Sequence, residues 1–245
     1  MRRRLSQLGL AGEADISARH LSFVETGRAR PSRGMLLRLA DELDMPPRTR
    51  NELLRAGGFA DLHPRRSLDE PALAPARVAI EIVLRAHEPF PAVAVDRTWT
   101  LVAGNDAVGA LLAGLPPAML VPPVNVLRLS LHPEGLAPRI LNLGQWRAHL
   151  LSRLRRDIER TGDPALQALL AELHALPFRA SAAPADDLGG LAVPLRLRVP
   201  GFDRPLCLLS TTTVFGTAVD ETVAELTLEC FLPADEDTRR MLTAR

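Results

Sequence analysis

Three short apolar patterns with helical spacing follow one another within the first sixty residues, and each begins at a serine. A serine in this place favours the start of a helix, because its hydroxyl accepts a backbone N–H group of the first turn. Helices this short are stable only when they pack against one another, so this region is predicted to form one small all-α domain. The first three expected helices begin at Ser6, Ser17 and Ser32, and a fourth, after a break at residues 45–47, runs to Arg55 before Gly57-Gly58.

The formal net charge of +1 hides an uneven distribution of charge along the chain. Residues 1–66 contain 13 arginines and 8 acidic residues, whereas the rest of the chain contains 17 arginines and 21 acidic residues. A small basic domain joined to a larger, mildly acidic one is typical of a protein that binds a polyanion with one domain only.

The first two expected helices are joined by a tight turn at residues 14–16. This arrangement is typical of a helix-turn-helix, in which the second helix lies in the DNA major groove with its N-terminal residues at the base edges. Leu21 and Val24 have the spacing of the inward face. The residues expected to face outward and contact DNA are Ser17, Ala18, Arg19, His20 and Ser22.

Residues that flank the second helix are expected to contact the phosphate backbone. Gln7 opens the preceding helix and can reach a phosphate with its amide, and Arg28 and Arg30 follow the second helix in a loop. Each assignment has a plain alternative. Arg19 can be a solvated surface arginine, His20 can pack locally, and the two loop arginines can supply only diffuse positive charge.

The N-terminal region also resembles a known family of DNA-binding domains. The run SARHLSFVETGRARPS, within residues 1 to about 60, closely resembles the xenobiotic-response-element (XRE) type of helix-turn-helix. The resemblance implies that the helix opening at Ser6-Gln7 crosses the DNA backbone, that the helix opening at Ser17 reads the groove, and that Glu25 organises the domain. Sequences of this type have a full helix before the LSQ segment, of which only Met1–Leu5 remain here. The first helix is therefore expected to be truncated, through either a misassigned start codon or an incomplete helical core.

Residues 61–74 are rich in proline and charge and lack periodicity, which predicts a linker. A second domain over residues 75–242 contains five strand candidates, at residues 92–95, 99–103, 191–199, 206–214 and 223–232. Together with helical patterns they predict an α+β domain whose sheet is packed on one side. The apolar sets of these helices are Val78, Ile82 and Val83; Leu111 and Leu112 after a cap at Asn105; Trp146, Leu150, Leu154 and Ile158; and Leu166, Leu169, Leu170 and Leu173.

The second domain resembles the ligand-binding domain of MmyB-like regulators. The stretches that carry the resemblance are PAVAVDRTWTLVAGNDAVGALL, NVLRLSLHPEGLAPRILNLGQWRAHLLSRLRRD and the terminal strands. The resemblance implies a PAS-like sheet that curls around an apolar pocket, with a fatty-acid-like ligand.

Candidate ligand-binding residues are Trp99, Asn105, Trp146 and His149. Aromatic side chains often line pockets, and polar groups near Trp146 could anchor a carboxylate. The alternatives are that both tryptophans belong to the core and that Asn105 only caps a turn or helix.

Several other classes of protein lack support in the sequence. There is no CxxC pair, HExxH, Walker A loop or GxSxG elbow, and Cys207 and Cys230 are expected to be buried thiols. No apolar run approaches the roughly 18 residues that a membrane-spanning helix needs. We therefore expect a cytoplasmic protein that is not an enzyme and uses no cofactor, metal or membrane.

The combined prediction is an all-α helix-turn-helix head followed by an α+β, PAS-like ligand-binding domain. Such a protein would be a dimeric transcription regulator whose binding to a double-stranded DNA operator is modulated by a small apolar ligand. The alternative is a lipid-binding or protein-interaction module with a degenerate helix-turn-helix that no longer binds DNA.

Overall fold

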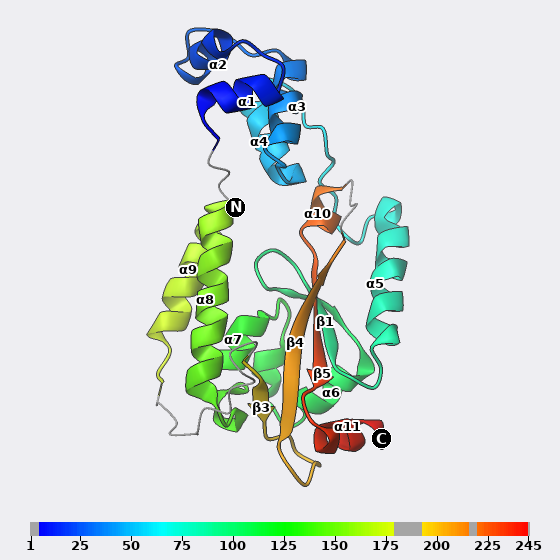
Figure 1. The fold of residues 1–245 in the computed structure, drawn as a ribbon. Helices are drawn as coiled ribbons and strands as arrows, with labels where there is room; N and C mark the ends of the chain where they lie inside the picture. Colours follow the sequence, from blue (N-terminus) through cyan, green and yellow to red (C-terminus); the bar gives the residue numbers. More distant parts are fainter. Residues whose placement is uncertain (1–4, 179–192, 216–219, 245) are drawn as a thin grey trace. The chain divides into compact units, whose positions relative to one another are not determined.

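The computed structural model describes residues 5–178, 193–215 and 220–244. The chain divides into two compact units, which Figure 1 draws as a ribbon. The first unit comprises Met1–Leu73 and Phe215–Ala224, and the second comprises Ala74–Val214 and Glu225–Arg245. The first unit is therefore larger than the expected head of residues 1–60. The shortened N-terminal helix falls mostly on residues 1–4, which lie outside the described residues.

Four helices of the first unit form where the serine caps and helix stops predict them. The hydroxyl oxygens of Ser6, Ser17 and Ser32 each accept the backbone N–H group three residues on. The second helix ends before Gly27, whose φ of 72° suits glycine and few other residues. The helices are α1 (Gln7–Glu13), α2 (Ala18–Glu25), α3 (Arg33–Glu42) and α4 (Pro47–Ala56).

The first three helices share a small core. Its buried members are Ala11 and Ala14 at the end of α1, Leu21 of α2, and Met35 and Leu39 of α3. The turn between α1 and α2 bends sharply at Asp15, whose φ is 49°. The predicted helix-turn-helix is thus confirmed as a packed unit.

The residues predicted to form a linker pack against α4. The side-chain oxygen of Asn51 accepts the N–H groups of Leu62 and His63 at 2.9 and 3.0 Å. Leu73 is buried in the short 3₁₀-helix η1 (Pro71–Leu73) that precedes the second unit. Residues 61–73 are therefore part of the first unit, because buried groups on α4 fix the chain that follows it.

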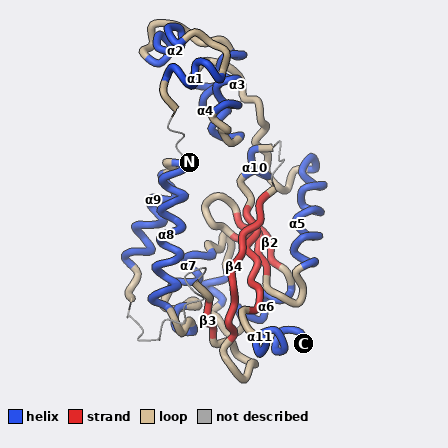
Figure 2. Tube along the Cα trace, viewed as in Figure 1, coloured by secondary structure: helices blue, strands red, loops and turns tan. Residues whose placement is uncertain are grey.

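The second unit is built on a five-stranded antiparallel sheet in the order β2-β1-β5-β4-β3, shown in red in Figure 2. This confirms the expected α+β class. All five strand candidates contribute a strand, although three of them have different limits. The strands are β1 (Ala92–Val95), β2 (Leu101–Gly104), β3 (Leu195–Leu197), β4 (Leu206–Val214) and β5 (Thr227–Pro233).

One of these shifts concerns the last strand, which was expected to begin at residue 223. The chain instead forms a short helix, α10 (Glu221–Ala224), before β5. A carboxylate oxygen of Asp220 accepts the N–H group of Thr222 at 2.9 Å, which stabilises a turn in place of an extended chain. The candidate at residues 191–199 forms a strand only over Leu195–Leu197, and residues 191 and 192 lie outside the described residues.

Helices cover the sheet, with α8 and α9 on one side of it and α5 on the other (Figure 1). Trp146, Leu150 and Leu154 are buried on α8 and Leu166, Leu169 and Leu173 on α9, as their spacing predicted. No helix among the described residues is long and apolar enough to cross a membrane. The remaining bounds are α5 (Ala74–Ala86), α6 (Asp106–Leu112), η2 (Pro117–Leu120), α7 (Val126–Leu131), η3 (Ala137–Arg139), α8 (Leu143–Thr161), α9 (Pro164–Ala175) and α11 (Glu236–Thr243).

Helix α5 is amphipathic, but the face that it buries differs from the predicted one. Ile80 and Leu84 are buried, whereas Val78 and Ile82, which were expected inside, are exposed. Both pairs have the same i, i+4 spacing, so periodicity alone does not distinguish them.

Matched truncations on α5 test this assignment. Leu84 is 3% exposed and Ile82 is 62% exposed. We expect Leu84→Ala to lower the free energy of unfolding by about 2–5 kcal/mol, because it removes buried methyl groups and leaves a cavity. In the monomeric chain, at low protein concentration, Ile82→Ala should change it by less than about 0.5 kcal/mol. Urea titrations followed by circular dichroism would measure both values, and equal losses would contradict the observed facing of α5.

Candidate DNA-binding surface and ligand cavity

The predicted DNA-contacting residues gather on and around α2. Ser17, Arg19 and His20 are exposed at its N-terminal end, where a helix in the major groove meets base edges. Ala18 is only partly exposed, because it packs against the core shared by α1, α2 and α3. Ser22 is half-buried one turn further along.

The side chains of Arg19 and Gln7, two of the predicted DNA-contacting residues, also have partners within the domain. The guanidinium of Arg19 lies 5.3 Å from the centre of the Phe23 ring, one turn along α2. The amide of Gln7 donates a hydrogen bond of 2.5 Å to the carboxylate of Glu25, which joins the first turn of α1 to the last residue of α2. This bond agrees with the organising role that the resemblance implied for Glu25. A phosphate contact by Gln7 would use an amide that Glu25 already orients.

The loop after α2 presents exposed cations. Arg28 and Arg30 are both exposed, and Arg33 and Arg38 are exposed on α3. The backbone N–H group of Arg28 donates to the carbonyl oxygen of Phe23 at 2.7 Å, which fixes the start of the loop. Exposed guanidinium groups beside a fixed backbone suit contacts with phosphate oxygens.

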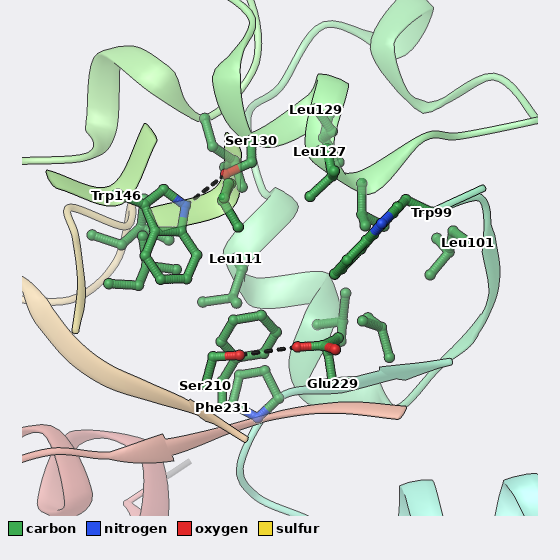
Figure 3. A pocket seen from close by; sticks show the side chains of 18 of the residues that line it. Trp99, Leu101, Leu111, Leu127, Leu129, Ser130, Trp146, Ser210, Glu229 and Phe231 are labelled. Carbon is green, nitrogen blue, oxygen red and sulfur yellow. Dashed lines mark hydrogen bonds between the residues drawn. The ribbon is translucent and has the colours of Figure 1, made fainter. Parts of the chain in front are cut away.

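The second unit contains a cavity of about 100 Å³ between the sheet and helices α6, α7 and α8. Trp99 and Trp146 lie on opposite sides of it, and Ser210, Glu229 and Phe231 of the sheet form another wall (Figure 3). Most of the lining is aliphatic, so the cavity suits an apolar ligand. The aliphatic lining includes Val93, Leu101, Val108, Leu111, Leu127, Leu129, Leu150, Leu195 and Leu197.

The turn between β1 and β2 holds Trp99 in an uncommon backbone conformation. Its φ is 65°, a value that costs energy for a bulky residue. One carboxylate oxygen of Asp96 accepts the N–H groups of Thr98 and Thr100, both at 2.8 Å. The N–H group of Val126 donates to the carbonyl oxygen of Trp99 at 2.9 Å. This network fixes the strained turn and keeps the indole at the cavity wall.

Trp146 is held from the opposite side of the cavity. Its indole N–H donates to the hydroxyl oxygen of Ser130 at 3.0 Å. Its ring stacks on the imidazole of His149, with centroids 5.5 Å apart and planes at 23°. His149 thus supports Trp146 from outside the lining of the cavity.

The polar part of the cavity is an ion pair between α8 and β5. An Arg153 N–H group donates to the Glu229 carboxylate at 2.8 Å, and a second short bond joins the same two groups. The hydroxyls of Ser210 and Thr212 also donate to this carboxylate, at 3.0 and 3.2 Å. The Arg153 guanidinium lies 4.6 Å from the centre of the Trp99 ring. The buried charge of Glu229 is therefore fully compensated.

The other polar candidates serve the fold around the cavity. The Asn105 side chain accepts the N–H group of Ala92 at 3.0 Å and donates to the carbonyl oxygens of Leu84 and Phe90. It therefore joins the end of α5 to β1, and it does not line the cavity. Asn142 bridges α8 to β3 by accepting the N–H group of Arg196.

Sequence reasoning missed Arg153, Glu229 and Ser210. Glu229 alternates with Leu228 and Cys230, a pattern that usually places the charged residue toward water. Arg153 stands in an arginine-rich stretch of α8 where nothing distinguishes it from its exposed neighbours. Phe231 lies on the same face of β5 as Glu229. Its apolar side chain was the one nearby sign in the sequence that other parts of the protein pack over this face.

The environment of His149 generates a pH prediction. Burial, and then the nearby Arg153 and Arg156 guanidinium groups, lower the pKa of this imidazole from its ordinary value. The unfolded chain therefore binds a proton at His149 more readily than the folded chain does. The contribution of the neutral, stacked ring to stability is complete above a pH of about 6.5 and is lost as the pH falls below that value.

We expect the free energy of unfolding to fall between pH 7.5 and 5.5, and to fall less in His149→Gln. Urea titrations of both proteins at the two pH values measure the difference. Because the other histidines are common to both proteins, their contribution cancels in the comparison. The same pH dependence in both proteins would show that His149 is not responsible.

Comparison with known protein families agrees with this geometry. Residues 76–244 match the family described as MmyB-like transcription regulator ligand binding domain, and residues 1–53 match a helix-turn-helix domain family. No curated protein that was compared with the chain matches it. The first match covers more than half of the chain and contains the whole cavity. The chain therefore belongs to the family of transcription regulators with an MmyB-like ligand binding domain, which here follows a helix-turn-helix domain.

Proposed function

We propose that this regulator binds its operator through α2, and that a small apolar, fatty-acid-like ligand in the cavity of the second unit modulates this binding. The observation that carries the proposal is the apolar cavity with one polar corner, in a chain whose other unit is a helix-turn-helix. A ligand with different affinities for two states of the protein shifts the balance between them, and so changes its affinity for DNA.

Contacts that select a base sequence and contacts that bind any DNA should come from different residues of the helix-turn-helix. Arg19 lies at the end of α2 that reads base edges, whereas Arg28 lies in the loop beyond it. An arginine can form two hydrogen bonds with a guanine, and losing such a pair costs about 1–3 kcal/mol for the correct sequence. A phosphate contact favours all sequences alike.

We expect Arg19→Ala to weaken binding to the operator by about 1–3 kcal/mol and to relax one base position, and Arg28→Ala to weaken binding to every sequence. Fluorescence anisotropy with DNA from just upstream of the gene, and with random DNA, at two salt concentrations measures both effects. Equal losses on both DNAs for both variants would refute these roles. Absence of salt-dependent binding by the unmodified chain would favour the alternative of a module that does not bind DNA.

The proposal includes a homodimer. One small head makes too few contacts to select a single operator, whereas two heads can occupy half-sites about 34 Å apart. Exposed Val78 and Ile82 form an apolar strip on α5, flanked by the exposed charges of Glu81 and Arg85. We assign this strip to contact with a second copy, whose equivalent acidic and basic residues can pair across it. A light-scattering mass of 26.7 kDa at all concentrations, with and without DNA, would contradict the dimer.

The volume of the cavity limits the ligand that it can hold as it stands. An engineered apolar cavity of about 150 Å³ accommodates benzene, and the present cavity measures about 100 Å³. A fatty acid of medium length must therefore move the walls apart when it binds. Its carboxylate would compete with Glu229 for Arg153, whereas a neutral head group would use Ser210 without breaking the ion pair.

Tryptophan fluorescence can report ligand binding, because both tryptophans of the chain line the cavity. Titration with decanoic acid should give a saturable change in tryptophan fluorescence, which Leu111→Phe should weaken by filling the cavity. Decanol, with the same chain and a neutral head group, shows whether the carboxylate contributes. No response to any acid or alcohol from six to sixteen carbons would rule out this ligand class.

A further inference from the structure

Residues 220–224, which lie between β4 and β5 in the sequence, belong to a different unit from these two strands. Residues 220–224 pack with the helix-turn-helix, whereas β4 and β5 form the centre of the sheet in the second unit. We call these residues the 220–224 segment; they include α10 (Figure 1). Only residues 225 and 226 separate this segment from the start of β5, so a displacement of β5 reaches it directly along the chain.

A buried carboxylate fastens the 220–224 segment to α4. The side chain of Glu221 is 3% exposed, and its two oxygens are 2.9 Å from an N–H group of Arg48 and 2.9 Å from the amide nitrogen of Asn51. Both partners belong to α4. A charge buried to this degree is tolerated only while such donors surround it, so the contact is either formed in full or lost.

Asn51 extends the same network to the chain after α4. It is fully buried, and its amide also donates to the carbonyl oxygen of His63 at 2.7 Å. The N–H group of Glu221 donates to the carbonyl oxygen of Pro64 at 3.0 Å, and the Thr222 hydroxyl donates to that of Arg66 at 2.6 Å. The 220–224 segment therefore holds both α4 and residues 63–66.

The other end of the same stretch of chain lies at the cavity. Ser210 on β4 and Glu229 and Phe231 on β5 line it, and Glu229 follows Glu221 by eight residues. Because these residues form one wall of a cavity of about 100 Å³, a ligand that widens the cavity on this side must displace the strands. One stretch of chain thus carries a buried carboxylate at the cavity wall and another on the DNA-binding unit.

We propose that the 220–224 segment is the element through which the cavity controls the helix-turn-helix. Movement of β5 on ligand binding withdraws Glu221 from Arg48 and Asn51, which loosens α4 and residues 62–66 and changes the affinity for DNA. The inference rests on the proposed function for its ligand, but the contact between Glu221 and α4 is independent of any ligand.

The test compares the full chain with Glu221→Ala, using decanoic acid as the probe. In the unmodified chain, decanoic acid should increase amide hydrogen exchange over residues 47–66 and change the dissociation constant for DNA at least fivefold. In Glu221→Ala these amides should exchange faster even without the acid, and the acid should change DNA affinity less than twofold. Tryptophan fluorescence should show that the variant still binds the acid.

Two further variants sharpen the comparison. Glu236→Ala removes an equally charged residue whose ion pair with Arg239 is exposed on α11, and it should behave as the unmodified chain does. Glu221→Gln keeps an acceptor for Asn51 but loses the charge that faces Arg48, so it should give an intermediate effect. It replaces Glu221→Ala if the latter fails to fold. A full ligand effect on DNA affinity in both Glu221 variants would overturn the proposal.

A failure of the proposed ligand is distinguishable from a failure of this coupling. Leu111→Phe enlarges a wall residue and so perturbs the cavity without any ligand. It should alter hydrogen exchange over residues 47–66 when Glu221 is present and leave it unchanged in the double variant with Glu221→Ala. An equal change in both backgrounds, or none in either, would refute the coupling even if decanoic acid does not bind.

Discussion

The buried ion pair of Arg153 and Glu229 is the contact on which the ligand cavity depends. It joins α8 to the centre of the sheet, and the same guanidinium lies over the ring of Trp99. An ion pair in this position adds little net stability relative to apolar residues, but losing one partner leaves a buried charge at a cost of about 3–5 kcal/mol. The pair therefore makes the position of α8 relative to β5 specific, and it provides the only acidic group in the cavity lining of the described residues.

The cavity is small because its walls are held from several directions. Trp146 is fixed by Ser130 and by the stacked His149, and Trp99 by the network around Asp96. Trp146 cannot turn aside without losing its hydrogen bond to Ser130 and its stacking on His149, and Trp99 cannot turn without leaving the Arg153 guanidinium. A ligand larger than the free space must move whole elements, and β5 is preceded by the 220–224 segment, which belongs to the other unit. In the coupling that we propose, the same rigidity that limits the cavity converts its occupation into movement of the backbone.

The helices of the helix-turn-helix depend on one another for stability, because each of them is too short to be stable alone. Serine caps satisfy the first backbone N–H groups, and the shared core of alanines, Leu21, Met35 and Leu39 supplies the remaining stability. Gln7 and Glu25 link α1 to α2 at the surface that we assign to DNA. Arg28 and Arg30, in the loop after α2, are exposed to solvent. In the DNA complex that we propose, phosphate oxygens are their partners.

Local signals in the sequence were sufficient for the four N-terminal helices, the strand Leu206–Val214 and the main helices of the second unit, because caps, glycine stops and apolar periodicity act between near neighbours. They also predicted that Trp99 and Trp146 are candidates for a pocket. Tertiary structure decided which face of α5 is buried, since Val78 and Ile82 repeat with the same spacing as Ile80 and Leu84. It also decided that Glu221 and Glu229 are buried. A carboxylate enters the interior only where donors from distant segments meet it, as Arg48 and Asn51 do for one and Arg153 for the other, and no local pattern records such a meeting.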